Sequence, residues 1–206
     1  MSQNSVPTST SEMEKTEGCG CMQRRTVLKG VAAIGMMGLG GGGAAFAQGT
    51  SPAAMPPQPG DFLVLTTGNT PLTPADIRST TQLAEAFAMA PDGTVRNEFM
   101  NTVLLMKYDE GALAPEVAEK SGEGVLGYST ICTHSGCPVN TRLDGTLIAC
   151  DCHGSRFDPT MNGDVANGPA ARKLPQLTIG VQDGKLVVLE GFDGKIGGDS
   201  FGDEDR

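Results

Sequence analysis

The amino-acid sequence predicts an all-β domain built from antiparallel strands. Apolar runs of strand length recur along the chain, at residues 62–66, 102–108, 125–131, 177–181 and 185–189. Asp-Gly pairs at residues 144–145 and 183–184 are turns of the kind that join neighbouring strands into hairpins. Only two short stretches, residues 73–76 and 115–120, begin like helices. Strands therefore dominate the predicted fold.

Residues 1–47 are predicted to be an export signal or a membrane anchor rather than part of that domain. Arg24 and Arg25, followed by Thr-Val-Leu-Lys, resemble a twin-arginine export signal. The uncharged run 31–47 comes next and ends in Ala-Phe-Ala, a small-residue cleavage pattern. At about 17 residues, the run is also at the short limit of a membrane-spanning helix, so a retained anchor stays open. Cys19 and Cys21 are interpreted as incidental thiols of the leader.

The segments that flank the domain have a different composition. Residues 48–60 are rich in Ser, Pro and Ala, which predicts a semi-rigid linker rather than a structured element. The folded domain is expected to span residues 61–196. The chain is glycine-rich and acidic from residue 191 onward, so it should fray, and residues 197–206 are predicted to be an acidic flexible tail.

One segment has no clear secondary structure in the sequence. Residues 82–90 contain four alanines, which favour a helix, and a Pro-Asp-Gly turn follows at once. The formal net charge is −9, which argues against a nucleic-acid-binding protein because such proteins usually carry a basic face. The acidity indicates solubility, or a surface that steers a basic redox partner such as a soluble cytochrome.

The residues that can carry chemistry gather in two short boxes. Both histidines and four of the six cysteines occur there. The first box, residues 132–137, reads Cys-Thr-His-Ser-Gly-Cys. The second, residues 150–155, reads Cys-Asp-Cys-His-Gly-Ser. Each box thus offers one Cys-His pair and one further cysteine, and thiolates with imidazoles suit a soft metal site of iron or zinc size.

Three interpretations of the boxes compete. A closed zinc site of two cysteines and two histidines has suitable ligands but leaves two cysteines without a role. A scaffold made only of disulfides leaves both histidines unexplained. A [2Fe–2S] cluster with two cysteines on one iron and two histidines on the other, braced by one disulfide, uses every residue.

The two boxes resemble those of the Rieske proteins of cytochrome bc and bf complexes. The resemblance implies a Rieske-type antiparallel sandwich with a small cluster-binding subdomain and one [2Fe–2S] cluster per chain. It assigns Cys132 and Cys150 to one iron, and His134 and His153 to the other. It also implies a disulfide between Cys137 and Cys152, the cysteines of the two boxes that do not bind iron.

The resemblance extends to residues around the cluster. Ser155 matches a serine that donates a hydrogen bond to a bridging sulfide. Gly168 and Pro169 resemble the proline loop that covers the cluster in this family.

Three positions depart from the pattern of the bc proteins. Ser135 stands in place of a leucine at the exposed tip, and Asp151 in place of a proline. Phe157 stands where high-potential members carry a tyrosine whose hydroxyl bonds a cluster ligand. A missing hydroxyl and an added carboxylate both disfavour reduction, so we expect a reduction potential below that of typical ubiquinol-oxidising members.

The resemblance implies the one-electron-carrying subunit of a quinol–cytochrome c reductase, with cytochrome b and c subunits as partners and quinol as a possible donor. Such a protein lies on the periplasmic side of a bacterial inner membrane, anchored or exported by the twin-arginine route, where a disulfide persists. The alternative is a periplasmic electron-transfer protein or a small subunit of another oxidoreductase, for example a molybdenum enzyme. Both histidines are committed to iron, so no independent catalytic site is expected.

Overall fold

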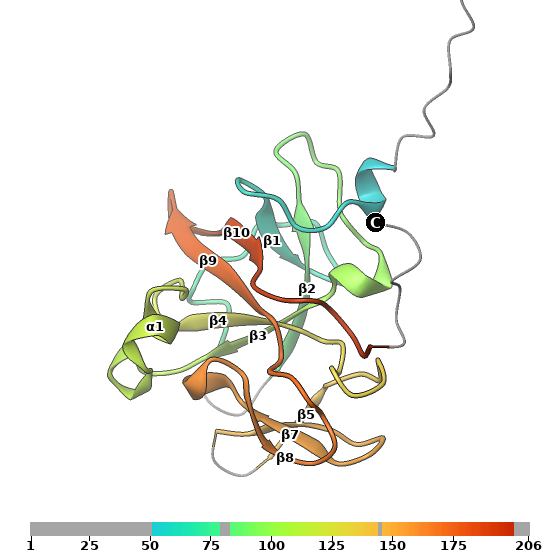
Figure 1. The fold of residues 1–206 in the computed structure, drawn as a ribbon. Coiled ribbons are helices and arrows are strands. Elements are labelled where there is room, and N and C mark those ends of the chain that lie inside the picture. Colours follow the sequence, from blue (N-terminus) through green and yellow to red (C-terminus); the bar gives the residue numbers. More distant parts are fainter. Residues whose placement is uncertain (1–50, 79–82, 144–145, 200–206) are drawn as a thin grey trace, which may run out of the picture. The chain divides into compact units, whose positions relative to one another are not determined.

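The computed structural model describes residues 51–78, 83–143 and 146–199, and these residues form two antiparallel sheets (Figure 1). The larger sheet closes into a barrel with the strand order β1-β10-β9-β4-β3-β2. Its strands are β1 (Phe62–Leu65), β2 (Ala84–Met89), β3 (Val103–Lys107), β4 (Val125–Ser129), β9 (Gln176–Gln182) and β10 (Lys185–Phe192). The smaller sheet contains β5 (Thr141–Arg142), β6 (Ile148–Cys150), β7 (Ser155–Asp158) and β8 (Asp164–Asn167). The all-β prediction is confirmed.

Helices are short in the part of the chain that the structure describes. The α-helix α1 (Pro115–Ala118) is a single turn, with proline at its first position. Single 3₁₀ turns are η1 (Pro52–Ala54), η2 (Phe99–Asn101), η3 (Glu110–Ala112) and η4 (Pro159–Met161). None of these described helices is long and apolar enough to cross a membrane.

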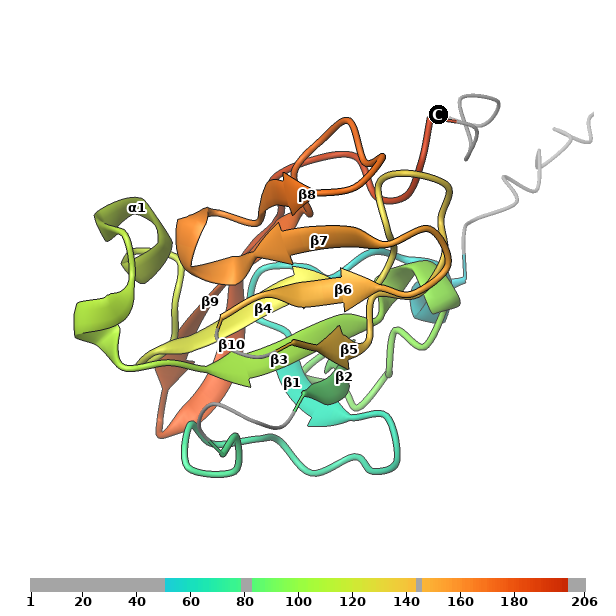
Figure 2. The ribbon, with the colours of Figure 1, turned by 90° about the horizontal axis from the view of Figure 1, so that it is seen from below.

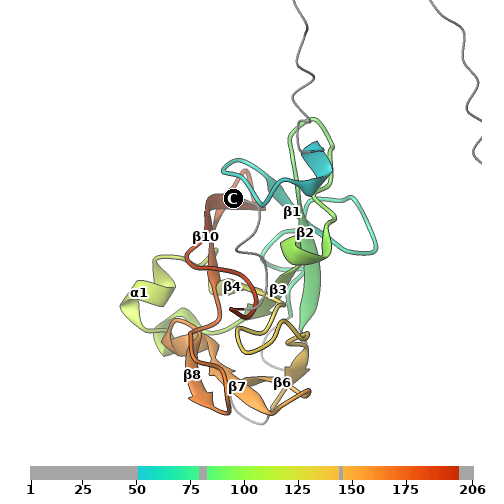
Figure 3. The same cartoon turned by 45° about the vertical axis from the view of Figure 1, so that its right-hand side comes forward.

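The small sheet is an insertion between two neighbouring strands of the barrel. Strand β4 pairs with β9, with Gly127 opposite Leu177 and Tyr128 opposite Gln176. The chain therefore leaves the barrel after β4 and re-enters it beside its point of departure. The small sheet lies next to the barrel, on the side of β3 and β4 (Figures 2 and 3).

Strand β3 shows why the barrel and the insertion stay together. Successive side chains of a strand point to opposite faces. Val103 and Leu105 pack inside the barrel, whereas Leu104 and Met106 pack into a second core with residues of the small sheet. All four side chains are fully buried. An uninterrupted apolar run is what a strand with two buried faces requires.

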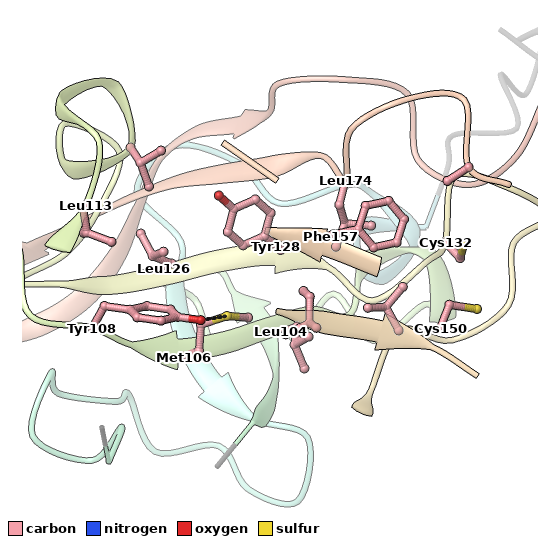
Figure 4. Packing of buried hydrophobic residues seen from close by; sticks show 14 residues of the cluster. Leu104, Met106, Tyr108, Leu113, Leu126, Tyr128, Cys132, Cys150, Phe157 and Leu174 are labelled. Carbon is pink, nitrogen blue, oxygen red and sulfur yellow. Dashed lines mark hydrogen bonds between the residues drawn. The ribbon is translucent and has the colours of Figure 1, made fainter. Parts of the chain in front are cut away.

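The second core carries the chemistry-bearing residues at one end. It contains Tyr128 from the barrel and Phe157 from the small sheet, together with Cys132 and Cys150. Figure 4 shows the two cysteines at one end of this core and Leu113 at the other. Since the sulfurs belong to a packed core, the positions of the two boxes are tied to the stability of the whole domain.

The structure resolves one segment that the sequence left open and corrects one expectation. The alanine-rich segment is strand β2, because pairing with β1 and β3 outweighs the helix propensity of alanine. Its small side chains Ala86 and Ala88 point into the barrel and are fully buried. Residues 73–76 form a turn without a helix, closed by the Asp76 carboxylate, which accepts hydrogen bonds from the backbone N–H and the hydroxyl of Thr73 at 2.8 Å each.

The described part of the predicted linker is packed on the barrel, contrary to expectation. The buried Arg96 donates to the carbonyl of Pro52 at 2.9 Å and pairs with the buried Asp61 at 2.5 Å. The amide of Asn101 donates to the carbonyl of Met55 at 2.8 Å. Prolines cannot donate a backbone hydrogen bond, but the backbone carbonyls of a proline-rich segment can still accept one, and these carbonyls attach the segment to the barrel.

The segment after β10 also differs from the expected frayed tail. Residues 193–199 follow the surface of the domain, and Gly197 and Gly198 are buried. The guanidinium of Arg172 donates to the carbonyl of Gly197 at 2.7 Å. The prediction failed because it used composition alone, and Arg172 lies 25 residues away in sequence. Residues 200–206 of the predicted tail, and the Asp-Gly pair 144–145, lie outside the described residues.

Candidate metal centre

The two boxes fold into the same kind of turn. In the first, the N–H of Gly136 donates to the carbonyl of Cys132 at 2.9 Å. In the second, the N–H of Gly154 donates to the carbonyl of Cys150 at 3.0 Å. Both glycines have a positive φ, 78° and 75°, which other residues rarely adopt. Each box therefore needs its glycine to reverse the chain within two residues of its histidine.

Different elements hold the two turns in place. The first turn follows β4 and is closed at its base by the bridge between Ile131 and Pro138. The second turn joins β6 to β7, so Cys150 ends one strand and Ser155 begins the next. The sequence-predicted hairpin between the boxes is present, since β5 pairs with β6.

In the folded chain the two proposed histidine ligands meet each other, and the two proposed cysteine ligands are neighbours of each other. The rings of His134 and His153 meet edge to face, with centroids 4.7 Å apart and an interplanar angle of 82°. Cys132 and Cys150 are each only 1% exposed. His134 is half-buried, and His153 is exposed. The donor set is thus divided into two buried thiols and two imidazoles nearer to the surface, which fits a two-iron cluster with one sulfur-ligated and one nitrogen-ligated iron.

The remaining cysteines lie beside this set. All four described cysteines are free thiols in the structure, and the sulfurs of Cys137, Cys150 and Cys152 lie within 4.8 Å of one another. Burial, together with the neighbouring thiol of Cys132, raises the pKa of the Cys150 thiol to about 12. A hydrogen bond with Cys137 raises the pKa of Cys152. A metal on those three sulfurs alone would leave the facing histidines without a role.

A third loop, residues 168–172, supports both boxes. Gly168 (φ 93°) packs so tightly on the second box that an added methyl would lie 2.5 Å from the Cα of Ser155. The hydroxyl oxygen of Ser155 accepts a hydrogen bond from the N–H of Ala170 at 3.2 Å. Pro169, which precedes Ala170 in the chain, is exposed. This contact confirms that the proline-containing loop lies against the second box.

The same loop reaches the first box through residues that the sequence did not reveal. The hydroxyl of Thr133 donates to the carbonyl of Arg172 at 2.6 Å. Thr133 is buried. Its position between two proposed ligands was a signal, available in the sequence, that it could help to hold the first box. Arg172 offers none, because it lies 39 residues from its partner.

The three departures from the bc pattern occupy different surroundings. The hydroxyl oxygen of Ser135 is 3.4 Å from Nδ1 of His134. Asp151 is exposed and accepts a hydrogen bond from the hydroxyl of Thr141. Phe157 is fully buried in the same core as both buried cysteines.

Comparisons with known proteins identify the family of the chain. The family model described as the Rieske [2Fe–2S] domain matches residues 86–178. A cytochrome bc1 complex Rieske iron–sulfur subunit from Streptomyces lividans is 36% identical over 148 residues, which cover 67% of this chain and 85% of the relative. The chain belongs to the Rieske [2Fe–2S] family. The cofactor of this Rieske domain is accordingly a [2Fe–2S] cluster.

Other proteins similar to this Rieske chain are named for different systems. A putative respiratory nitrate reductase subunit Rieske from Haloferax mediterranei is 43% identical over 96 residues, or 46% of this chain and 43% of the relative. This chain thus spans less than half the length of that relative. Among solved structures, the plasma membrane Rieske protein PetC3 from Synechocystis PCC 6803 is 27% identical and covers 50% of this chain and 84% of that one, with a TM-score of 0.34.

Proposed function

We propose that this protein is a one-electron carrier in which Cys132 and Cys150 bind one iron and His134 and His153 bind the other. The observation that carries the proposal is the edge-to-face meeting of the two imidazoles, one from each box, together with one buried thiol in each box. A bound cluster of this type supplies a redox centre with a higher potential than an all-cysteine cluster, because neutral imidazoles replace anionic thiolates. The folded domain expected at residues 61–196 provides these ligands, and neighbouring residues on both sides, among them Pro52 and Gly197, also pack on it.

The cysteine ligands and the histidine ligands have different surroundings, and we assign them different roles. The packed core excludes water from the two cysteines, whereas the exposed imidazole of His153 offers a short route to a partner bound at the surface. The loop containing Gly168 and Pro169 fixes the second box through its contacts with Ser155. Cys137 and Cys152 are proposed to form a disulfide that joins the two boxes, which the proximity of their sulfurs supports.

The biological role that we propose is that of the iron–sulfur subunit of a quinol–cytochrome c reductase. This role is supported by the relatives that are subunits of cytochrome bc1 complexes. Cytochrome b and c subunits would be the partners, and quinol the electron donor. Purification of the natively expressed, affinity-tagged chain from its membranes should recover a cytochrome b, and quinol should reduce the cluster in that complex. Recovery with a different oxidoreductase and no cytochrome b would refute this role.

A second role is favoured by a specific observation. The 43% identity to a putative nitrate reductase Rieske subunit exceeds the 36% identity to the Streptomyces lividans bc1 subunit. Ser135, Asp151 and Phe157 also depart from the bc pattern. The protein would then be a small subunit of another oxidoreductase, or a separate periplasmic carrier, and would not react with quinol. The same purification distinguishes the two roles by the partner that it recovers.

The proposed location is the periplasmic side of a bacterial inner membrane, with residues 1–47 as a twin-arginine signal or an anchor. The support is the pair Arg24-Arg25 in front of a glycine-rich apolar run. A cluster assembled in the cytosol must cross the membrane inside a folded protein. Replacing both arginines by lysines should trap the protein in the cytoplasm. Normal periplasmic amounts of the Lys-Lys variant would contradict the twin-arginine route.

A further inference from the structure

The segment that follows β10 runs along the first ligand-bearing box. We call residues 193–199 the C-terminal strap. Gly197 and Gly198 of the strap are buried. A methyl group added at Gly198 would lie 2.5 Å from the carbonyl oxygen of His134 and 2.9 Å from the Cα of Ser135. The strap backbone therefore lies directly on the backbone that carries His134, with no room for a side chain between them.

Arg172 joins the strap to the first box. Its guanidinium donates to the carbonyls of Lys195 and Gly197, at 3.1 and 2.7 Å. Its own carbonyl accepts the hydrogen bond from Thr133 at 2.6 Å. The guanidinium also pairs with Asp199 at 3.1 Å, but that carboxylate is 78% exposed, and exposed ion pairs contribute little. The two carbonyl contacts are therefore the important ones.

The beginning of the strap is fixed independently. The carboxylate of Asp193 accepts hydrogen bonds from the ammonium groups of Lys120 and Lys173, each at 2.7 Å, and from the N–H of Gln176 at 2.8 Å. One end of the strap is thus held at the barrel and the other by Arg172. A segment fixed at two points can hold the loop on which it lies.

We propose that Arg172 is a positioning residue for His134: it latches the C-terminal strap onto the first box. The latch fixes the backbone of the half-buried His134 and shields it from solvent on the strap side, while His153 stays exposed. This inference rests on the proposed function, because it concerns a ligand of the cluster. Groups that orient a ligand and control the access of water to a metal site tune its redox and spectroscopic properties.

The strap provides a matched pair of substitutions. Gly198→Ala places a methyl against His134, whereas Gly194→Ala, in the same strap, meets only Pro175 at an ordinary 3.7 Å. Neither glycine has a positive φ. In the full-length, cluster-loaded protein, we expect Gly198→Ala to change the midpoint potential and the electron paramagnetic resonance (EPR) g values. Gly194→Ala should keep both at the wild-type values.

Arg172→Gln tests the latch without adding any atoms at Gly198. Loss of the charged donor should speed hydrogen exchange of the amides of residues 132–137 by about tenfold, since hydrogen bonds from charged groups hold local structure closed. It should also shift the potential. Arg156→Gln is the charge-matched control, because Arg156 is exposed on β7 beside the second box.

The outcomes separate this inference from the proposed function. Altered g values, potential and exchange in Gly198→Ala and Arg172→Gln, with both controls unchanged, support the latch. If Gly198→Ala does not fold, Arg172→Gln decides alone. Variants that match their controls beside a normal wild-type Rieske signal overturn the latch only. A wild-type protein without a Rieske signal overturns the proposed function instead.

Discussion

The two ligand-bearing boxes have the same turn but opposite surroundings. Residues 132–137 are enclosed, since Cys132, Thr133 and Gly136 are buried and the C-terminal strap lies on His134. Residues 151–154 are all exposed, although the loop begins at the buried Cys150 and ends at the buried Ser155. A shared local motif therefore does not fix how a ligand meets solvent. That property comes from segments far along the chain.

This difference leaves one side of the site more accessible to a redox partner than the other. The first box is enclosed by the third loop and the strap, whereas the second box presents His153 and Asp151 to the surroundings. Electron exchange with a partner should therefore favour the side of the second box.

The largest effect is expected from removing either histidine. His134→Ala and His153→Ala should each abolish the Rieske EPR signal, because the boxes differ in exposure but each supplies one ligand to the same iron. Ser135→Ala, adjacent to the first histidine, is the control and should keep the signal. A full signal in either histidine variant would show that the two boxes are not equivalent in ligation.

The second prediction concerns the glycines at the second box. Gly154→Ala should cost about 1–2 kcal/mol of unfolding free energy through its left-handed backbone alone. Gly168→Ala adds a clash with the backbone of Ser155 to the same kind of strain, and overpacking adds about 1–3 kcal/mol. Urea denaturation of both variants measures the difference. Equal losses would show that the loop is not packed on the box.

The third prediction concerns the link between the boxes. If Cys137 and Cys152 form a disulfide, it closes a loop of about 14 residues and stabilises the folded domain by roughly 3 kcal/mol. Cys137→Ser or Cys152→Ser should lower the thermal stability of the cluster-loaded domain, although a fraction of the molecules should still assemble the cluster. Serine at Cys19 and Cys21 should change nothing. Equal stability of wild type and either mutant would show that the pair is not bonded.

The smallest expected effect comes from Phe157→Tyr. The ring is fully buried in the core that holds Cys132 and Cys150, so its added hydroxyl can donate to a ligand sulfur. Hydrogen bonds to charged acceptors contribute roughly 1.5–3 kcal/mol, and only the part that strengthens on reduction raises the potential, by some tens of millivolts. Phe99→Tyr, at a 55% exposed position, is the control. An unchanged or lowered potential would leave Phe157 as core packing alone.

The sequence predicted those parts of the molecule whose causes are local. The strands with continuous apolar runs, the hairpin of β9 and β10 and the helical turn at Pro115 are all present. The two boxes also meet as expected, because ligand type and spacing are written in a few consecutive residues.

Other features could not be predicted because distant residues cause them. Strand β2 exists through pairing with its neighbours, although its alanines favour a helix. The described linker residues are held by Arg96, which lies 44 residues from Pro52. The strap is held by Arg172. No local pattern marks an arginine that will find a particular carbonyl after folding.

The central claim is that one iron of the cluster is bound by His134 and His153 together. Its most direct test is pulsed EPR of the full-length protein, exported with its cluster, reduced, and labelled with ¹⁵N-histidine. We expect two coupled histidine nitrogens in the spectrum, both lost in the His134→Ala and His153→Ala variants, and chemical analysis of the same sample should give two irons and two sulfides per chain. Zinc in place of iron, or a cluster without coupled histidine nitrogen, would contradict it.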